Sequence, residues 1–300
     1  MRKIDEAADA AESDLLRRAK TGDGGALSTL LKAHEPAARR ALRFLVAERD
    51  DVNDLMQETL LDAFTRIAEH ETGTPFSLWL QTFAIRQAGT FLALKKRWRP
   101  AAQIHLQKAC ANAGISGDVM DVLRDDSLSF NIRDHVGFCF AAVGRSLPMQ
   151  QQMAVVLTDL LDFSLEQAAD ALRMRVDDVR TYSDDGRIAM QALYDRMCRF
   201  SNAQGACDQC RGLRAVAPGE RNLRQADPAG LDAESGENRR RHRLRVVREA
   251  DIDRGPAQKL HDLLFGMLSR NEADRDTAAE TDDEIPGGVA RWEELQDFNN

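Results

Sequence analysis

Residues 50–99 read DDVNDLMQETLLDAFTRIAEHETGTPFSLWLQTFAIRQAGTFLALKKRWR, and this stretch decides the fold. Its first half repeats apolar residues at the spacing of an α-helix and keeps polar residues on the other side. Its second half opens on Thr74-Pro75, a common start of a helix, and carries aromatic residues before a basic end. The sequence therefore predicts two amphipathic helices joined by a short turn.

The first of these helices presents an apolar side and a polar side. The apolar positions are Val52, Leu55, Met56, Leu60, Ala63, Phe64 and Ile67. The polar side carries Asp54, Gln57 and Glu58, about a turn apart. Taken alone, these three residues fit either a solvated face or a contact with another protein.

Composition narrows the class of protein. The chain has 300 residues, 43% of them apolar, and a net charge of −8, so any nucleic-acid surface must be local. The polar N-terminus shows no secretory signal, and no apolar run approaches the ~18 residues of a membrane span, so we expect a cytoplasmic protein. No nucleophile–base pair, phosphate loop or dinucleotide motif is visible, and we expect no enzyme activity.

A second helical block begins near Ser129. Helices are predicted over 132–143 and 150–161, followed by Ser164 and Gln167 in the spacing of a capping box. A longer helix is predicted to start near Val176, after a tight turn. Short helix, turn and longer helix form the helix-turn-helix arrangement, which serves either DNA reading or packing alone.

These blocks resemble a known family. Asp54-Leu-Met-Gln57-Glu58 followed by Phe64 resembles the polymerase-docking helix of bacterial sigma factors. The run from Phe76 through Trp79 to Arg86, ending in Lys/Arg, resembles the promoter-melting helix of the extracytoplasmic-function (ECF) group. Leu147-Pro148-x-Gln150 and the 164–179 segment resemble that group's upstream-promoter-reading domain. The resemblance covers residues 13–197.

The resemblance implies an all-α fold of two helical domains, a region 2-like bundle and a region 4-like helix-turn-helix domain. We expect a flexible leader (1–12), a polymerase-binding and promoter-melting domain (13–99) and a linker (100–128). The helix-turn-helix domain (129–197), a cysteine cluster (198–213) and a C-terminal extension (214–300) would follow.

The family also implies partners and residue roles. Core RNA polymerase, promoter DNA and an anti-sigma or other regulatory protein are the expected partners. Asp54, Gln57 and Glu58 would bind polymerase. The residues implied for DNA contact are Trp79, Arg86, Lys95, Lys96, Arg97, Arg175, Arg180, Thr181 and Arg187. Other readings stay open: Trp79 suits a core position, and the 95–99 cations suit the C-terminal end of a helix dipole.

The predicted recognition helix departs from the family pattern. It carries Asp177, Asp178, Asp184 and Asp185 against only Arg180 and Arg187. Each carboxylate near a phosphate adds repulsion, so we expect weaker DNA contact than a basic helix would give. The alternative function is therefore a sigma-like regulatory protein that binds polymerase or a partner but has lost promoter recognition. A metal-binding scaffold without a DNA role is a third reading.

A cysteine cluster follows the second block. Cys207 and Cys210 form a Cys-x-x-Cys pair, Cys198 is a third thiol, and His135 or Cys139 would supply a fourth ligand if the tail folds back. No cofactor is required by this interpretation. Zinc binding, thiol oxidation and unremarkable thiols all remain open.

The C-terminal extension changes composition along its length. Residues 214–238 favour disorder, whereas Arg239 starts a basic amphipathic helix with Leu244, Val246 and Val247, and 259–268 predicts another. The basic helix either docks on the rest of the chain or polymerase, or is a solvated charge run.

Overall fold

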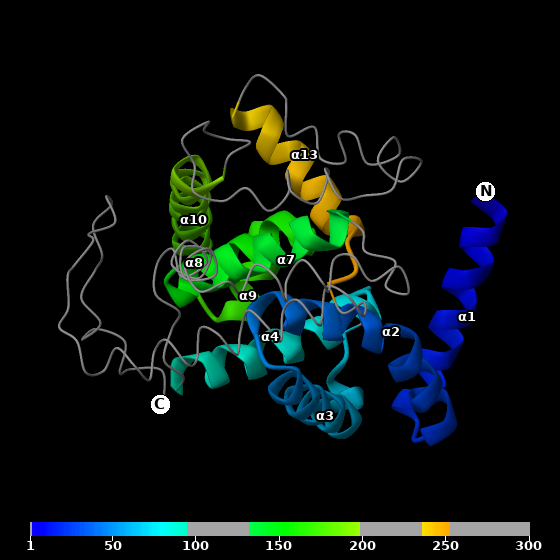
Figure 1. The fold of residues 1–300 in the computed structure, drawn as a ribbon. Helices are drawn as coiled ribbons and strands as arrows, with labels where there is room; N and C mark the ends of the chain where they lie inside the picture. Colours follow the sequence, from blue (N-terminus) through cyan, green and yellow to red (C-terminus); the bar gives the residue numbers. More distant parts are fainter. Residues whose placement is uncertain (1, 72, 95–131, 199–235, 253–300) are drawn as a thin grey trace.

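The computed structural model describes residues 2–71, 73–94, 132–198 and 236–252 (Figure 1). These ranges contain helices and their connections and no β-strand, which confirms the predicted all-α class. The predicted linker 100–128 and residues 199–235 lie outside the described residues. The proposed domain boundaries therefore stay a prediction.

The first unit is built from the N-terminal helices. Its elements are α1 (Arg2–Lys20), α2 (Gly24–Leu45), α3 (Arg49–Arg66), the 3-10 turn η1 (Ile67–Glu69) and α4 (Phe76–Leu94). Asp23 caps α2, because its side chain accepts a hydrogen bond of 3.0 Å from the Ala26 N–H. Helix α1 begins at Arg2, within the segment expected to be a flexible leader.

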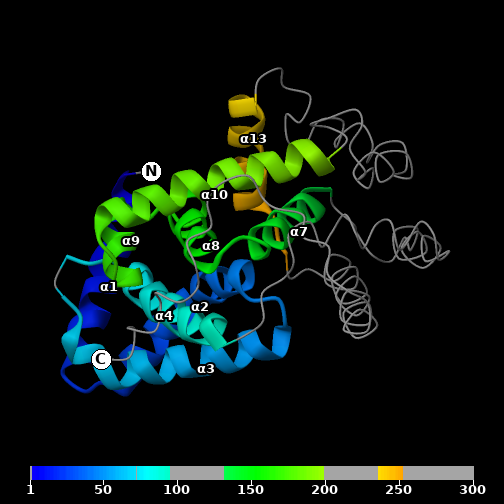
Figure 2. The ribbon, with the colours of Figure 1, turned by 90° about the vertical axis from the view of Figure 1, so that its left-hand side faces the viewer.

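The second unit contains the helix-turn-helix elements. They are α7 (Ile132–Arg145), α8 (Met149–Val155), the π-helical turn η2 (Val156–Leu160), α9 (Leu165–Leu172) and α10 (Val176–Met197). The predicted capping box is confirmed: Ser164 Oγ accepts from the Gln167 N–H, and Gln167 Oε1 accepts from the Ser164 N–H. Arg173, in the left-handed conformation, ends α9 and turns the chain into α10 (Figure 2).

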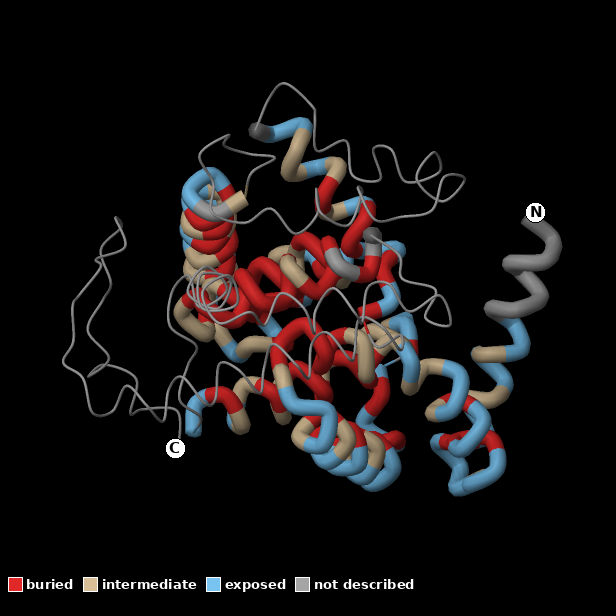
Figure 3. The backbone as a smooth tube through the Cα atoms, in the orientation of Figure 1, coloured by how far each residue is buried: buried red, intermediate tan, exposed pale blue. Residues whose placement is uncertain are grey.

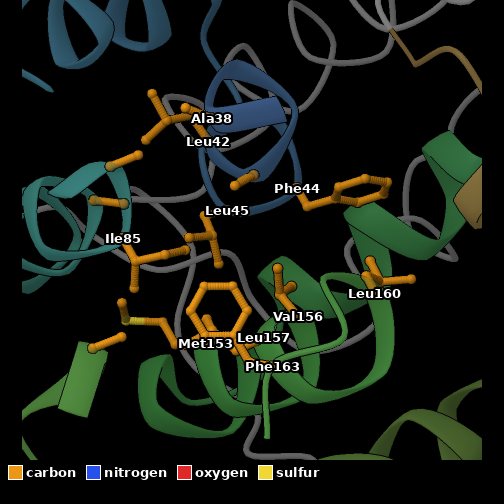
Figure 4. Close-up of a cluster of buried hydrophobic side chains, with 14 of the residues drawn as sticks. Ala38, Leu42, Phe44, Leu45, Ile85, Met153, Val156, Leu157, Leu160 and Phe163 are labelled. Atoms are coloured by element: carbon orange, nitrogen blue, oxygen red, sulfur yellow. The ribbon is translucent and has the colours of Figure 1, made fainter. Parts of the chain in front are cut away.

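The two units share one apolar core (Figures 3 and 4). In Figure 4, Phe44 and Leu45 of α2 and Ile85 of α4 lie with Met153 and Leu157 of the second unit. All of these side chains are less than about a tenth exposed. Burial of apolar surface stabilises the fold by ~25 cal/mol per Å² removed from water. The interface between the units is thus part of the hydrophobic core.

Side chains of the second unit also complete the end of α2. The last carbonyls of a helix lack intrahelical partners and need donors from elsewhere. Gln152 Nε2 donates to the carbonyls of Phe44 and Leu45 at 3.3 and 3.1 Å, and Arg145 Nη2 donates to that of Val46 at 2.9 Å. These contacts fix the orientation of the second unit on the first.

Helix α13 (Gly236–Glu249) comes from the C-terminal extension and packs against α7 at an angle (Figure 1). Val246 and Val247 are 4% and 0% exposed, which agrees with the amphipathic helix predicted from Arg239 onward. The helix starts at Gly236, within the segment for which disorder was predicted. The basic helix is therefore docked on the chain. The predicted helix at 259–268 lies outside the described residues.

Candidate functional site

The outer side of α3 carries the residues predicted to bind polymerase. Asp54, Gln57 and Glu58 are all exposed, whereas Val52 and Met56 on the opposite side are 1% exposed. Figure 3 shows this exposed side of α3 at the edge of the molecule. The three polar side chains therefore lie on an accessible face that the core does not use.

Two apolar residues extend this face. Leu61 is 59% exposed and Phe64 is 58% exposed, and both follow Glu58 at helical spacing. The prediction that Phe64 faces the core is wrong. Phe64 lies beside the buried stripe that contains Met56 and Ala63, and neither α2 nor α4 covers its ring.

We call Asp54, Gln57, Glu58, Leu61 and Phe64 the α3 face. Exposed apolar side chains are common when they stand singly. Here two of them adjoin acidic and amide groups on one helix, a mixture that suits a protein–protein contact. The sequence signal that could have revealed Leu61 is its position three residues after Glu58, on the polar side of the helix.

Trp79 belongs to an aromatic cluster inside the first unit. Its ring lies 4.7 Å from Phe83 in edge-to-face geometry, 5.3 Å from His70 and 5.5 Å from Phe76. Trp79 is half-buried, and such pairs stabilise packing by ~0.5–1.5 kcal/mol beyond their buried area. The described arrangement thus gives Trp79 a structural role, and its contact with DNA stays a prediction.

Arg86 lies between the two units. Its guanidinium donates to the carbonyls of Asp170 and Ala171 on α9 at 3.0 and 3.3 Å, and it meets the Asp170 carboxylate at 3.3 Å. Burial lowers the pKa of Arg86, and the Asp170 carboxylate acts in the opposite direction. In this arrangement Arg86 binds the end of a helix rather than an exposed groove. Lys95, Lys96 and Arg97 lie outside the described residues.

Each cation predicted to read DNA from α10 has a carboxylate beside it. Arg175 pairs with Asp178 at 2.8 Å and Arg180 with Asp177 at 3.5 Å. The Thr181 hydroxyl donates to the Asp177 carbonyl at 2.9 Å. The Arg175 guanidinium holds the pKa of Asp178 below its usual range. The acidic residues noted in the sequence therefore place a carboxylate beside each of these exposed cations.

Arg187 is engaged on the inner side of α10. Its guanidinium pairs with Asp159 at 2.6 Å and with Asp184 at 2.7 Å, and the Asp159 hydrogen bond raises the pKa of Arg187. Asp159 is 8% exposed and also accepts from Arg240 of α13 at 3.4 Å. Sequence reasoning missed Asp159, although an acid within the apolar run 153–161 is the pattern of a buried ion pair.

Both described cysteines lie near Tyr194 in the second unit. Cys198 follows α10, Cys139 lies on α7, and both are half-buried. Burial raises the pKa of the Tyr194 hydroxyl well above its usual value, and the neighbouring thiols of Cys139 and Cys198 add to this increase. Cys207, Cys210 and the side chain of His135 lie outside the described residues, and within those residues no cluster of three or more metal-ligating side chains occurs.

No helix within the described ranges has the length and apolar character needed to cross a membrane.

Comparison with known proteins matches residues 30–99 to the family model described as sigma-70 region 2. This range includes most of α2 and all of α3 and α4, and thus the whole α3 face. A curated relative, the ECF RNA polymerase sigma-E factor of Haemophilus influenzae, is 25% identical over 169 residues. The alignment covers 56% of this chain and 86% of that protein.

Two solved structures are similar to this chain over more than half of its length. One is CnrH in complex with the cytosolic domain of CnrY, with 19% identity, a TM-score of 0.43, and coverage of 62% of this chain and 97% of that one. The other is the sigma factor RpoE of Bartonella quintana with the anti-sigma factor NepR, with 20% identity, a TM-score of 0.38, and coverage of 56% and 96%. Residues 30–99 therefore match sigma-70 region 2, and the chain is similar to an ECF sigma factor over 169 residues.

Proposed function

We propose that this protein is a sigma factor that binds core RNA polymerase and directs it to promoters. The observation that carries the proposal is the α3 face, which lies within the region 2 match and is exposed along its full length. Its acidic and apolar groups suit a contact that another protein surface would bury. An anti-sigma or other regulatory partner is part of the same proposal.

Binding of core polymerase tests this role directly. The triple variant Asp54→Ala/Gln57→Ala/Glu58→Ala removes the polar half of the α3 face and leaves its buried side unchanged. We expect its affinity for purified core polymerase to fall by about tenfold or more, as for loss of interface hot spots. Glu71→Gln changes an exposed carboxylate outside the face and serves as the control. Equal affinities of the triple variant and wild type would contradict the proposal.

A second candidate function rests on α10. Because Arg175, Arg180 and Arg187 are all paired with carboxylates, a sigma-like regulatory protein without promoter recognition is the alternative. Gel retardation of promoter fragments across a salt series distinguishes the two. A factor that contacts phosphates loses affinity steeply as salt rises, whereas a regulator without promoter recognition binds weakly at every salt concentration.

We also propose that the cysteines respond to zinc or to thiol oxidation. The position of Cys139 and Cys198 beside the same side chain, Tyr194, supports this, because Cys139 lies on α7 and Cys198 directly follows α10 at the start of the cysteine segment. Thiolates are the ligands that structural zinc prefers. Zinc content of the full chain, compared with Cys207→Ser/Cys210→Ser, tests the metal. Equal metal content in both proteins would exclude a zinc site that uses this pair.

A further inference from the structure

Helix α13 contacts the first unit through its C-terminal end. Arg40 of α2 donates to the carbonyls of Val247 and Ala250 at 2.6 Å and to that of Arg248 at 2.9 Å. The last carbonyls of a helix lack intrahelical partners and carry the negative end of its dipole. A single guanidinium of the first unit therefore satisfies the end of a helix from the C-terminal extension.

The same helix contacts the second unit through charged groups. Arg248 donates to the Asp159 carbonyl at 2.6 and 3.0 Å and pairs with the Asp162 carboxylate at 2.7 Å. Arg240 reaches the Asp159 carboxylate at 3.4 Å. Asp159 thus holds α13 and Arg187 of α10 at the same time, because Arg187 pairs with it at 2.6 Å.

The segment after α13 fits closely against α7. Ala250 and Ile252 are 1% and 4% exposed, and the Asp251 N–H donates to the Asp134 carboxylate at 2.9 Å. A Cβ added at Gly137 would lie 2.6 Å from Ala250 Cβ and 2.9 Å from Ile252 Cγ2. Glycine is therefore required at position 137 for this segment to dock.

The contacts of α13 join the units in an arrangement that engages Arg86. In that arrangement the guanidinium of Arg86 is hydrogen-bonded to α9, and α4 packs against α8 and α9. While these contacts persist, the Nε and Nη2 donors of Arg86 are occupied by α9. Any use of Arg86 on DNA thus requires the two units to separate.

We propose that α13 is an intramolecular clamp: it holds the first and second units together and so restrains promoter engagement until it is released. The restraint on transcription rests on the proposed sigma function, whereas the clamp itself does not. Release of α13 from the two units is reversible, because the helix is rich in arginine and has few apolar residues. Such a helix stays soluble in water when it is not docked.

Hydrogen–deuterium exchange of the full chain tests the clamp. Gly137→Ala displaces the segment after α13, and Gly144→Ala is the matched control on the same helix, where an added Cβ meets no atom within 4 Å. Arg40→Met is a second variant that removes the contacts on α2. We expect both Gly137→Ala and Arg40→Met to accelerate exchange in α13, α4 and α9 by about tenfold, and the control to give no acceleration there.

Two exchange results would overturn the clamp. One is unchanged exchange in both variants, and the other is faster exchange in α13 without any change in α4 and α9. Run-off transcription with the same proteins tests the restraint: the two clamp variants should yield more transcript than wild type at equal concentration. Equal yields despite opening would contradict the restraint. Absence of transcript from every protein would contradict the proposed function, while exchange would still decide the clamp.

Discussion

Gly186 shows how one residue on α10 serves packing rather than helix formation. From sequence it only lowers helix propensity, by about 1 kcal/mol relative to alanine. In the structure, a Cβ there would lie 2.6 Å from Val155 Cγ2 and 3.1 Å from the Gln151 carbonyl oxygen. The glycine therefore permits α10 to approach the backbone of α8.

Substitution of Gly186 tests this close approach. Gly186→Ala should lower the free energy of unfolding by about 1–3 kcal/mol, because the added Cβ would overlap the short, stiff side chain of Val155 and crowd the Gln151 carbonyl oxygen. Gly144→Ala, which meets open space, should raise it by up to about 1 kcal/mol through helix propensity. Urea unfolding of both variants gives the comparison, and a stabilising effect at both positions would contradict the packing role.

His70 makes stability depend on pH. It is 2% exposed, and burial, together with the charge of Lys20, lowers its pKa below the ordinary 6.5. The unfolded chain then binds a proton near pH 6.5 that the folded chain takes up only at lower pH. The folded state therefore keeps its full stability with respect to His70 above pH 6.5, and the free energy of unfolding decreases as pH falls below that value.

Replacement of His70 by phenylalanine should remove part of this acid sensitivity. Phenylalanine keeps the ring contacts with Phe76 and Trp79 and has no titrating group. Urea unfolding of wild type and His70→Phe at about pH 7.5 and about pH 5.5 measures the difference. If the variant loses as much stability as wild type between these values, His70 is not the group responsible.

At the scale of elements, the sequence patterns predicted the features that depend on contacts between residues close together in the chain. The capping box at Ser164 and the long helix from Val176 were predictable because their hydrogen bonds lie within a few residues. The exposure and partners of residues that depend on elements distant in the chain were not predictable in this way. Phe64 faces solvent because of how α2 and α4 pack, and Asp159 is held by arginines of α10 and α13.

The acidic start of α10 should limit its affinity for DNA. Asp177→Asn/Asp178→Asn would release Arg180 and Arg175 for phosphate contact, and we expect affinity for promoter fragments to rise about three- to tenfold at low salt, with a steeper salt dependence. Asp195→Asn makes the same type of charge change at the far end of α10 and is the control. An affinity unchanged from wild type would show that this part of α10 does not face DNA.

At the scale of the whole molecule, the two units and α13 form one packed body that leaves the α3 face outward (Figure 3). This arrangement was beyond sequence analysis, because the contacts of Arg40 with α13 join residues 207 to 210 positions apart. The proposed contact of the α3 face with polymerase and the contact of Arg86 with α9 therefore involve different surfaces. In this arrangement the α3 face is exposed, whereas the guanidinium of Arg86 is bound to α9.

Run-off transcription with purified core polymerase is the most direct test of the proposed function. Genomic fragments are transcribed with polymerase alone, with the full chain, and with the Asp54→Ala/Gln57→Ala/Glu58→Ala variant. We predict discrete starts that require the chain and are lost or strongly reduced with the variant. If polymerase retains the full chain and the clamp variants Gly137→Ala and Arg40→Met in a binding assay but none of them gives a start above polymerase alone, the protein is a sigma-like regulator rather than an initiation factor.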